Sequence, residues 1–219
     1  MGENIADTAP GSVLFPEYGT LYDLIAPEVE GLTEAQLDFS SERWAWAEWS
    51  MRFQLSHIAY AIYSWLLVRW GETLFPHGEH GIEDVPGLTA SGFAHRLDAR
   101  RYWELPDLMQ QLHGAIDLAQ RVLAQRHVGF LRSQTLLRDS PEHWRLMLQA
   151  HPTGVTRATV PNKLLMTLEA TFRHVYFEAI THLFNMQRLK RAQGLPTVVE
   201  VPRLGYWVLD GWDRSEASS

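Results

Sequence analysis

Apolar residues recur at helical spacing in four stretches of this chain, and this repetition limits the fold more than any other feature of the sequence. The stretches cover about 18–29, 51–70, 106–123 and 162–193. Ser50 precedes the second stretch and Gly194 follows the fourth, where an N-cap and a stop signal are expected. Because each helix would bury one apolar face and strand patterns are few, we predict an all-α fold, a four-helix bundle with long connections.

Two long connections separate the predicted helices. The first, over 73–104, is rich in glycine and proline. The second, over 128–161, contains Ser140-Pro141, which predicts the start of one short helix because serine favours the cap and proline the first helical position. Unequal connections of this kind are compatible with a bundle whose loops cover one end.

No repeat or linker divides the chain, so we predict one domain over 1–219 with its core at about 15–196. The short C-terminal tail over 197–219 carries apolar and aromatic residues, and we expect it to pack on the body of the protein or on a partner.

The composition excludes several classes of function. The 19 Lys and Arg against 26 Asp and Glu give a net charge of −7, which argues against a protein that tracks nucleic-acid phosphates. The absence of cysteine excludes disulfides, Cys-based zinc sites and thiol nucleophiles. No window is apolar and long enough to cross a bilayer, and no targeting segment is evident. We therefore expect a cytoplasmic protein without nucleic-acid or membrane partners.

The fourth predicted helix carries polar side chains on its inward face. Its stripe is apolar at both ends, but Glu178, His182 and Asn185 occupy three successive core positions. An unpaired buried carboxylate there would be strongly destabilising. Because Glu178 and His182 are four residues apart, they lie on one helix face, where a carboxylate oxygen and an imidazole nitrogen can share a cation.

A metal site needs a further ligand from another part of the chain, and His57 in the second predicted helix is the best candidate. It lies in an otherwise apolar stretch, beside Leu55 and Ile58. Two histidines and one carboxylate leave coordination positions open, as reactive sites do. Spacing alone leaves a second interpretation: a His–Glu pair is often only a hydrogen bond or ion pair, and a lone histidine is often a core residue.

Two motifs in this order resemble the DinB/YfiT-like superfamily of four-helix bundles, over about 21–196. The first is a tryptophan and a serine that open a helix, followed two turns later by a histidine; the second is normally a pair of histidines four apart, then Gln, Arg and Gly. In this chain the residues are Trp49, Ser50 and His57, then Glu178, His182, Asn185, Arg191 and Gly194. Glu178 replaces the first histidine and Asn185 the glutamine. A Glu at this place is similar to the mycothiol-dependent maleylpyruvate isomerase branch.

The resemblance implies that His57, Glu178 and His182 hold a divalent metal ion, one of Zn, Ni, Mn or Fe. His174 and Asn185 are candidates for side chains that support these ligands, and His174 is also a candidate fourth ligand. The function implied is a metal-dependent transferase or isomerase that acts on a small electrophile with a low-molecular-weight thiol such as mycothiol or bacillithiol. A homodimer is expected from the same resemblance.

Other interpretations stay open. One is a non-enzymatic, stress-linked or small-molecule-binding protein with a structural or vestigial metal site. Metal-assisted hydrolysis is chemically possible, although no separate general base is identifiable. We interpret His77 and His80 as polar loop residues, and Trp44, Trp46 and Trp49 as core or lid packing that can wall a pocket.

Overall fold

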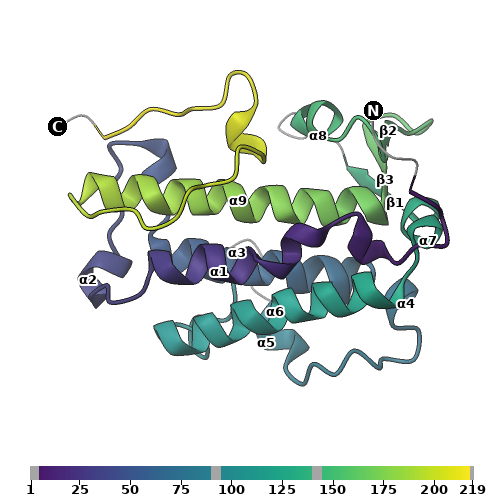
Figure 1. The fold of residues 1–219 in the computed structure, drawn as a ribbon, viewed down its shortest axis with the longest axis horizontal. Helices are drawn as coiled ribbons and strands as arrows, with labels where there is room; N and C mark the ends of the chain where they lie inside the picture. The colour runs from purple at the N-terminus through teal and green to yellow at the C-terminus, as the bar shows by residue number, and fades with distance from the viewer. Residues whose placement is uncertain (1–4, 90–94, 140–144, 218–219) are drawn as a thin grey trace.

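Three long helices form the body of the protein in this computed structural model, which describes residues 5–89, 95–139 and 145–217. They are α3 (Met51–Tyr63), α6 (Leu105–Gln125) and α9 (Leu168–Ala192). Figure 1 shows α9 lying along α3, with α6 on the other side of the molecule. Helix α3 packs against both α6 and α9, so it lies at the centre of the fold.

Local signals set the ends of these helices. The Ser50 side chain accepts a hydrogen bond from the Phe53 N–H at the start of α3, and Thr167 caps α9 by accepting from the Ala170 N–H. After α9, Gly194 adopts a φ of +70°, a left-handed conformation that favours glycine. The caps predicted from the sequence at Ser50 and Gly194 are therefore confirmed.

Helix α3 does not end at Tyr63 but continues as the π-helical segment η5 (Ser64–Arg69). Short helices fill the connections. They are α1 (Leu21–Ile25), α2 (Glu34–Leu37), α4 (Gly71–Leu74), α5 (Val85–Thr89), α7 (Val128–Ser133) and α8 (Arg145–Ala150). Single 3₁₀ turns accompany them at η1 (Gly11–Val13), η2 (Pro16–Gly19), η3 (Ala26–Glu28), η4 (Ala45–Ala47) and η8 (Tyr206–Val208).

An antiparallel sheet of three strands precedes α9. Its strands are β1 (Thr135–Asp139), β2 (Val155–Arg157) and β3 (Lys163–Thr167), in the order β1-β3-β2. Leu165 on the central strand pairs with Leu137 on one side and Thr156 on the other. Along β3 the side chains alternate, with Leu164 and Met166 buried and Leu165 exposed. The sheet therefore seals the core at the end of the molecule where α9 begins.

The prediction of an all-α four-helix bundle is wrong. The structure is about 54% helical, contains the three-stranded sheet, and has nine α-helices as well as shorter 3₁₀ and π segments among the residues that it describes. The helix predicted over 162–193 begins only at Leu168, because the preceding five residues form β3. Leu164 fitted the helical stripe, but its spacing from Met166 also fits the period of two of a strand.

The first predicted helix, over 18–29, is also wrong as a continuous element. Only α1 is α-helical there, and it passes into the 3₁₀ turn η3 at Ala26. Pro27 has no backbone N–H to donate to the preceding turn, so the α-helix ends before it. Ser140-Pro141, the predicted start of a short helix, lies outside the described residues, and α8 follows it.

The C-terminal tail packs on the body of the protein, which was one of the two arrangements expected from the sequence. In Figure 1 the yellow segment crosses α9, and η8 contacts that helix. Buried Glu28 in η3 holds this arrangement: its carboxylate accepts from Lys190 Nζ at 2.7 Å, Gln187 Nε2 at 2.8 Å and the Val198 and Val199 N–H groups. Among the described residues, no helix combines the length and apolar character needed to span a bilayer.

We expect Glu28→Gln to destabilise the protein by about 3–5 kcal/mol, because the Lys190 ammonium, only 4% exposed, would keep its charge without a counter-ion. Urea unfolding measures the change. The exposed neighbour Glu30→Gln is the matched control and should leave the midpoint unchanged. The double variant Glu28→Gln/Lys190→Met should recover part of the loss, and equal losses in the single and double variants would contradict this account.

The same pair predicts a pH dependence. Burial acts to raise the pKa of Glu28, but Lys190 and the backbone N–H groups outweigh it and lower that pKa below 4.5. The ionised carboxylate therefore stabilises the fold fully above pH 4.5 and loses this contribution as the pH falls through the lowered value. The stability difference between wild type and Glu28→Gln should shrink below pH 4.5.

Candidate metal centre

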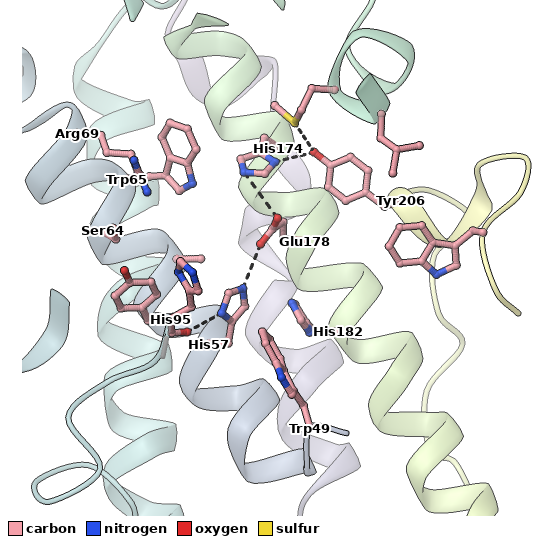
Figure 2. Close-up of a pocket in the computed structure, with 15 residues that line it drawn as sticks. Trp49, His57, Ser64, Trp65, Arg69, His95, His174, Glu178, His182 and Tyr206 are labelled. Atoms are coloured by element: carbon pink, nitrogen blue, oxygen red, sulfur yellow. Dashed lines mark hydrogen bonds and ion pairs between the residues drawn. The ribbon is translucent and has the colours of Figure 1, made fainter. Parts of the chain in front are cut away.

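The structure brings together the three side chains predicted as ligands. His57 comes from α3, and Glu178 and His182 lie one turn apart on α9. One ligand atom from each lies within 4.8 Å of the others, and together they can hold a metal ion. All three side chains are half-buried at a cavity wall (Figure 2). His57 therefore lies beside the Glu178–His182 pair, as the sequence predicted.

The orientation of His57 is fixed by a backbone carbonyl. Its Nδ1 lies 2.6 Å from the His95 carbonyl oxygen, which can only accept a hydrogen bond, so Nδ1 carries the proton. The Nε2 atom of His57 then faces Glu178 Oε2 at 3.2 Å. A lone pair and a carboxylate at this distance repel one another unless a proton or a cation lies between them. This geometry suits a metal ligand.

His182 is oriented in the same way by a side-chain amide. Gln54 donates from Nε2 to the Trp49 carbonyl at 3.2 Å, which turns its Oε1 toward His182. His182 Nδ1 donates to this oxygen at 2.6 Å, so its Nε2 is left as the coordinating atom. The ring also stacks on Trp49, with centroids 5.7 Å apart and planes inclined by 4°. Both histidines thus present Nε2 with the opposite nitrogen anchored.

Glu178 stays ionised because of its neighbours. Burial acts to raise its pKa, but His174, His57 and His182 outweigh burial and hold that pKa well below its ordinary range. Burial, reinforced by His57, lowers the pKa of His182 to about 3, so this ring is neutral near pH 7. A negative carboxylate and a neutral imidazole are the protonation states in which these groups bind a metal ion.

A buried cluster of side chains lies on the far side of Glu178. His174 Nε2 lies 3.7 Å from Glu178 Oε1, and its Nδ1 lies 2.6 Å from the Tyr206 hydroxyl oxygen, within hydrogen-bond distance. His151 Nε2 lies 2.8 Å from the same oxygen. Burial lowers the pKa of both histidines, and a neutral imidazole offers one donor and one acceptor nitrogen to such contacts. His174 therefore lies between Tyr206 and the Glu178 carboxylate, as Figure 2 shows.

Tyr206 reaches this position through a close backbone approach. Gly205 has a φ of +107°, and a Cβ there would lie 3.1 Å from the Phe177 carbonyl oxygen and 3.2 Å from Thr181 Oγ1. The Tyr206 N–H donates to Thr181 Oγ1 at 3.0 Å. Only glycine fits this contact without displacement, so residue 205 fixes where the tyrosine enters the site.

Two cavities meet at the cluster. The larger, of about 480 Å³, extends from Trp49 and His57 past Trp65 to Arg69. The smaller, of about 330 Å³, lies toward Trp46 and Asn185. Both are lined by Glu178, His182, Tyr206 and Trp212. The ligand cluster is therefore accessible from two chambers of the size that small molecules occupy.

The remaining sequence candidates have other positions. Asn185 lines the smaller cavity, and its side-chain oxygen accepts a hydrogen bond from Arg188 Nη1 at 3.2 Å. Among the described residues, no hydrogen bond joins Asn185 to the three ligand side chains. His77 is exposed, and His80 Nδ1 accepts from the Ile82 N–H at 3.1 Å. Neither belongs to the cluster, in agreement with their interpretation as loop residues.

Of the tryptophans, Trp49 lines the larger cavity and Trp46 the smaller, so both wall a pocket as the sequence allowed. Trp44 stacks on Trp46, with ring centroids 5.3 Å apart.

Sequence reasoning missed four supporting groups. Gln54, His151, Tyr206 and the carbonyl of His95 act through contacts between elements distant in sequence. A weak signal existed for Gln54, which lies three residues before His57 on the same helix. Nothing in the sequence distinguishes the other three. A backbone carbonyl can belong to any residue type, and the sequence of the tail does not indicate which part of α9 it contacts.

The donor set of two imidazole nitrogens and one carboxylate oxygen fits a divalent metal ion of the transition series and leaves positions open. The geometry does not distinguish among Zn, Ni, Mn and Fe. The chain matches no protein-family model, no curated protein and no solved structure.

We expect Gln54→Leu to weaken Zn²⁺ binding by about 10–100-fold while all three ligands remain, because His182 would lose the bond that fixes its ring and tautomer. Competition against a chromophoric chelator measures the affinity. Gln110→Leu, an exposed glutamine on α6, is the control and should bind as wild type does. Equal affinities in Gln54→Leu and wild type would show that His182 is not held for a metal.

Proposed function

We propose that this protein is a divalent-metal-dependent transferase or isomerase that joins a low-molecular-weight thiol to a small electrophile. The observation that carries the proposal is the His57–Glu178–His182 cluster on the wall shared by two cavities. The choice of a thiol comes from the resemblance of the two motifs to the DinB/YfiT-like superfamily. The absence of cysteine fits this choice, since the sulfur would have to come from a cosubstrate.

The chain supplies a site that is prepared for a cation. Gln54 and the His95 carbonyl hold the two imidazoles with Nε2 directed inward, and His174 supports Glu178. When bound, a divalent metal acts as a Lewis acid that lowers the pKa of a coordinated thiol or water. The aromatic rings of Trp49 and Tyr60 line the cavity beside the same residues.

Two cavities suit a reaction of two molecules. In a transfer, the S–H proton leaves to solvent, a C–S bond forms, and the bond from that carbon to its leaving group breaks. The two chambers allow the thiol and the electrophile to approach the shared wall from different sides, which favours the encounter by proximity. A protein that only stored a metal would need neither chamber.

The test measures metal content and thiol conjugation together. We expect wild type refilled with Zn²⁺, Ni²⁺, Mn²⁺ or Fe²⁺ to hold about one ion per chain, and His57→Ala to lose it, since two ligands on one helix bind weakly. The exposed His77→Ala is the control. Loaded wild type should accelerate conjugation of monochlorobimane with glutathione, cysteine, mycothiol or bacillithiol at least about tenfold over background.

The outcomes separate the alternatives. If neither wild type nor His57→Ala binds any of the four metals, the metal centre is refuted. If wild type binds metal but accelerates conjugation with none of the four thiols, the transferase proposal fails and a binding or structural role for the metal site remains.

A further inference from the structure

Arg69 stands apart from the other arginines that line or border the two cavities. It lies at the end of η5 and lines the larger cavity with His57 and Glu178 (Figure 2). Within the described residues it makes no hydrogen bond or ion pair, and its Nε is buried without a partner. Its guanidinium lies over the face of Trp65, with the guanidinium carbon 4.7 Å from the ring centroid, and Tyr60 and Glu178 act on it electrostatically.

The π-helical geometry of η5 places Arg69 over the cavity. Arg69 follows His57 by twelve residues, and in a continuous α-helix this step would turn its side chain about 120° away from that of His57. A π-helix has more residues per turn, so each residue of η5 rotates the chain by less and brings Arg69 back toward the His57 face. Both residues consequently line one cavity, together with Ser64 and Trp65 between them.

A second guanidinium lies beside the first. Arg138 on β1 is also directed at Trp65, with its guanidinium carbon 5.1 Å from the ring centroid. The two positive charges therefore share one indole at the edge of the cavity. Burial lowers the pKa of Arg69, and burial with the charge of Arg69 lowers that of Arg138 to about 10. Glu178 attracts Arg69 and Asp139 attracts Arg138, and an anion bound at Arg69 would add a further counter-charge to this pair of guanidiniums.

We propose that Arg69 binds the carboxylate of a small organic substrate whose reacting end lies at the His57–Glu178–His182 cluster. The guanidinium has the planar fork that matches a carboxylate. A monoanion is favoured over a phosphate dianion because the cavity already contains the negative charge of Glu178 and is lined mainly by aromatic and apolar groups. The assignment of this anion as substrate rests on the proposed function, whereas the binding of the anion at Arg69 does not.

The experiment is calorimetric titration of metal-free protein with benzoate, phenylacetate, neutral benzamide and phenyl phosphate. Removing the metal first prevents carboxylate coordination at the cluster from imitating binding at Arg69. We expect saturable 1:1 binding of benzoate or phenylacetate, at least tenfold weaker binding of benzamide, and at least tenfold loss of carboxylate affinity in Arg69→Met. Arg121→Met, an exposed arginine on α6, is the control and should bind as wild type does.

A stability measurement distinguishes a binding role from a structural one. Methionine keeps the contact with Trp65 and removes a buried charge, so Arg69→Met should leave the urea midpoint unchanged or raise it. A clearly lowered midpoint would assign Arg69 to the support of the fold and overturn the proposal.

The remaining outcomes are also decisive. The proposal is overturned if neither carboxylate binds at up to about 50 mM, a range that detects even millimolar affinity, if benzamide equals benzoate, or if Arg69→Met binds as wild type does. Tighter binding of phenyl phosphate overturns the choice of a carboxylate. Repeating the titration with zinc separates the two proposals. If the protein takes up no added zinc but still binds the carboxylate through Arg69, only the metal centre is refuted. If conjugation depends on zinc but Arg69→Met has no effect on carboxylate binding, only the anion site is refuted.

Discussion

The negative charge of Glu178 is the constraint on which the site depends. A carboxylate on the inward face of a long helix is unfavourable unless positive or hydrogen-bonding groups surround it. Here three histidines do so, from α3 through His57 and from α9 through His174 and His182. Two of them, His57 and His182, donate the N–H of Nδ1 to an oxygen elsewhere and so present Nε2 to the carboxylate side. One ligand atom from each of His57, Glu178 and His182 therefore lies within 4.8 Å of the others, an arrangement that can hold a cation.

The ligand cluster could be predicted from sequence because it depends on two regular features. Helical spacing puts Glu178 and His182 on one face of α9, and a lone histidine in the apolar stretch of α3 faces the same core. The fold prediction failed where two periods coincide. Leu164 and Leu168 have helical spacing, while Leu164 and Met166 have strand spacing, and the pairing of β3 with β1 and β2 decides between them. That pairing is a long-range interaction that no local pattern contains.

Other contributions to the site depend on backbone geometry. His95 has a φ of +48°, unusual for a residue with a Cβ, and offers its carbonyl to His57. Ser56, one residue before that histidine, accepts a hydrogen bond from the Leu97 N–H at 3.1 Å and holds the segment against α3. A residue in an unfavourable backbone conformation persists where its surroundings fix it. Here α3, the helix that carries His57, fixes His95. The π-helical turn of η5 is a second such feature, since the identities of residues 64–69 do not indicate it.

The C-terminal tail links the stability of the protein to the completeness of the site. It carries Tyr206 and Trp212 into the wall shared by the two cavities. It is attached through charged groups that lie away from the ligands: Glu28 accepts from the backbone at its start, and Arg188 donates to the Asp213 carbonyl at 3.2 Å near its end. Because Glu28 and Arg188 are buried, releasing the tail would remove backbone donors from Glu28 and an acceptor from Arg188 as well as open the site. The same release would remove the Tyr206 hydroxyl from His174 and so weaken the support of Glu178. Changes at the anchors should therefore alter metal affinity without touching a ligand.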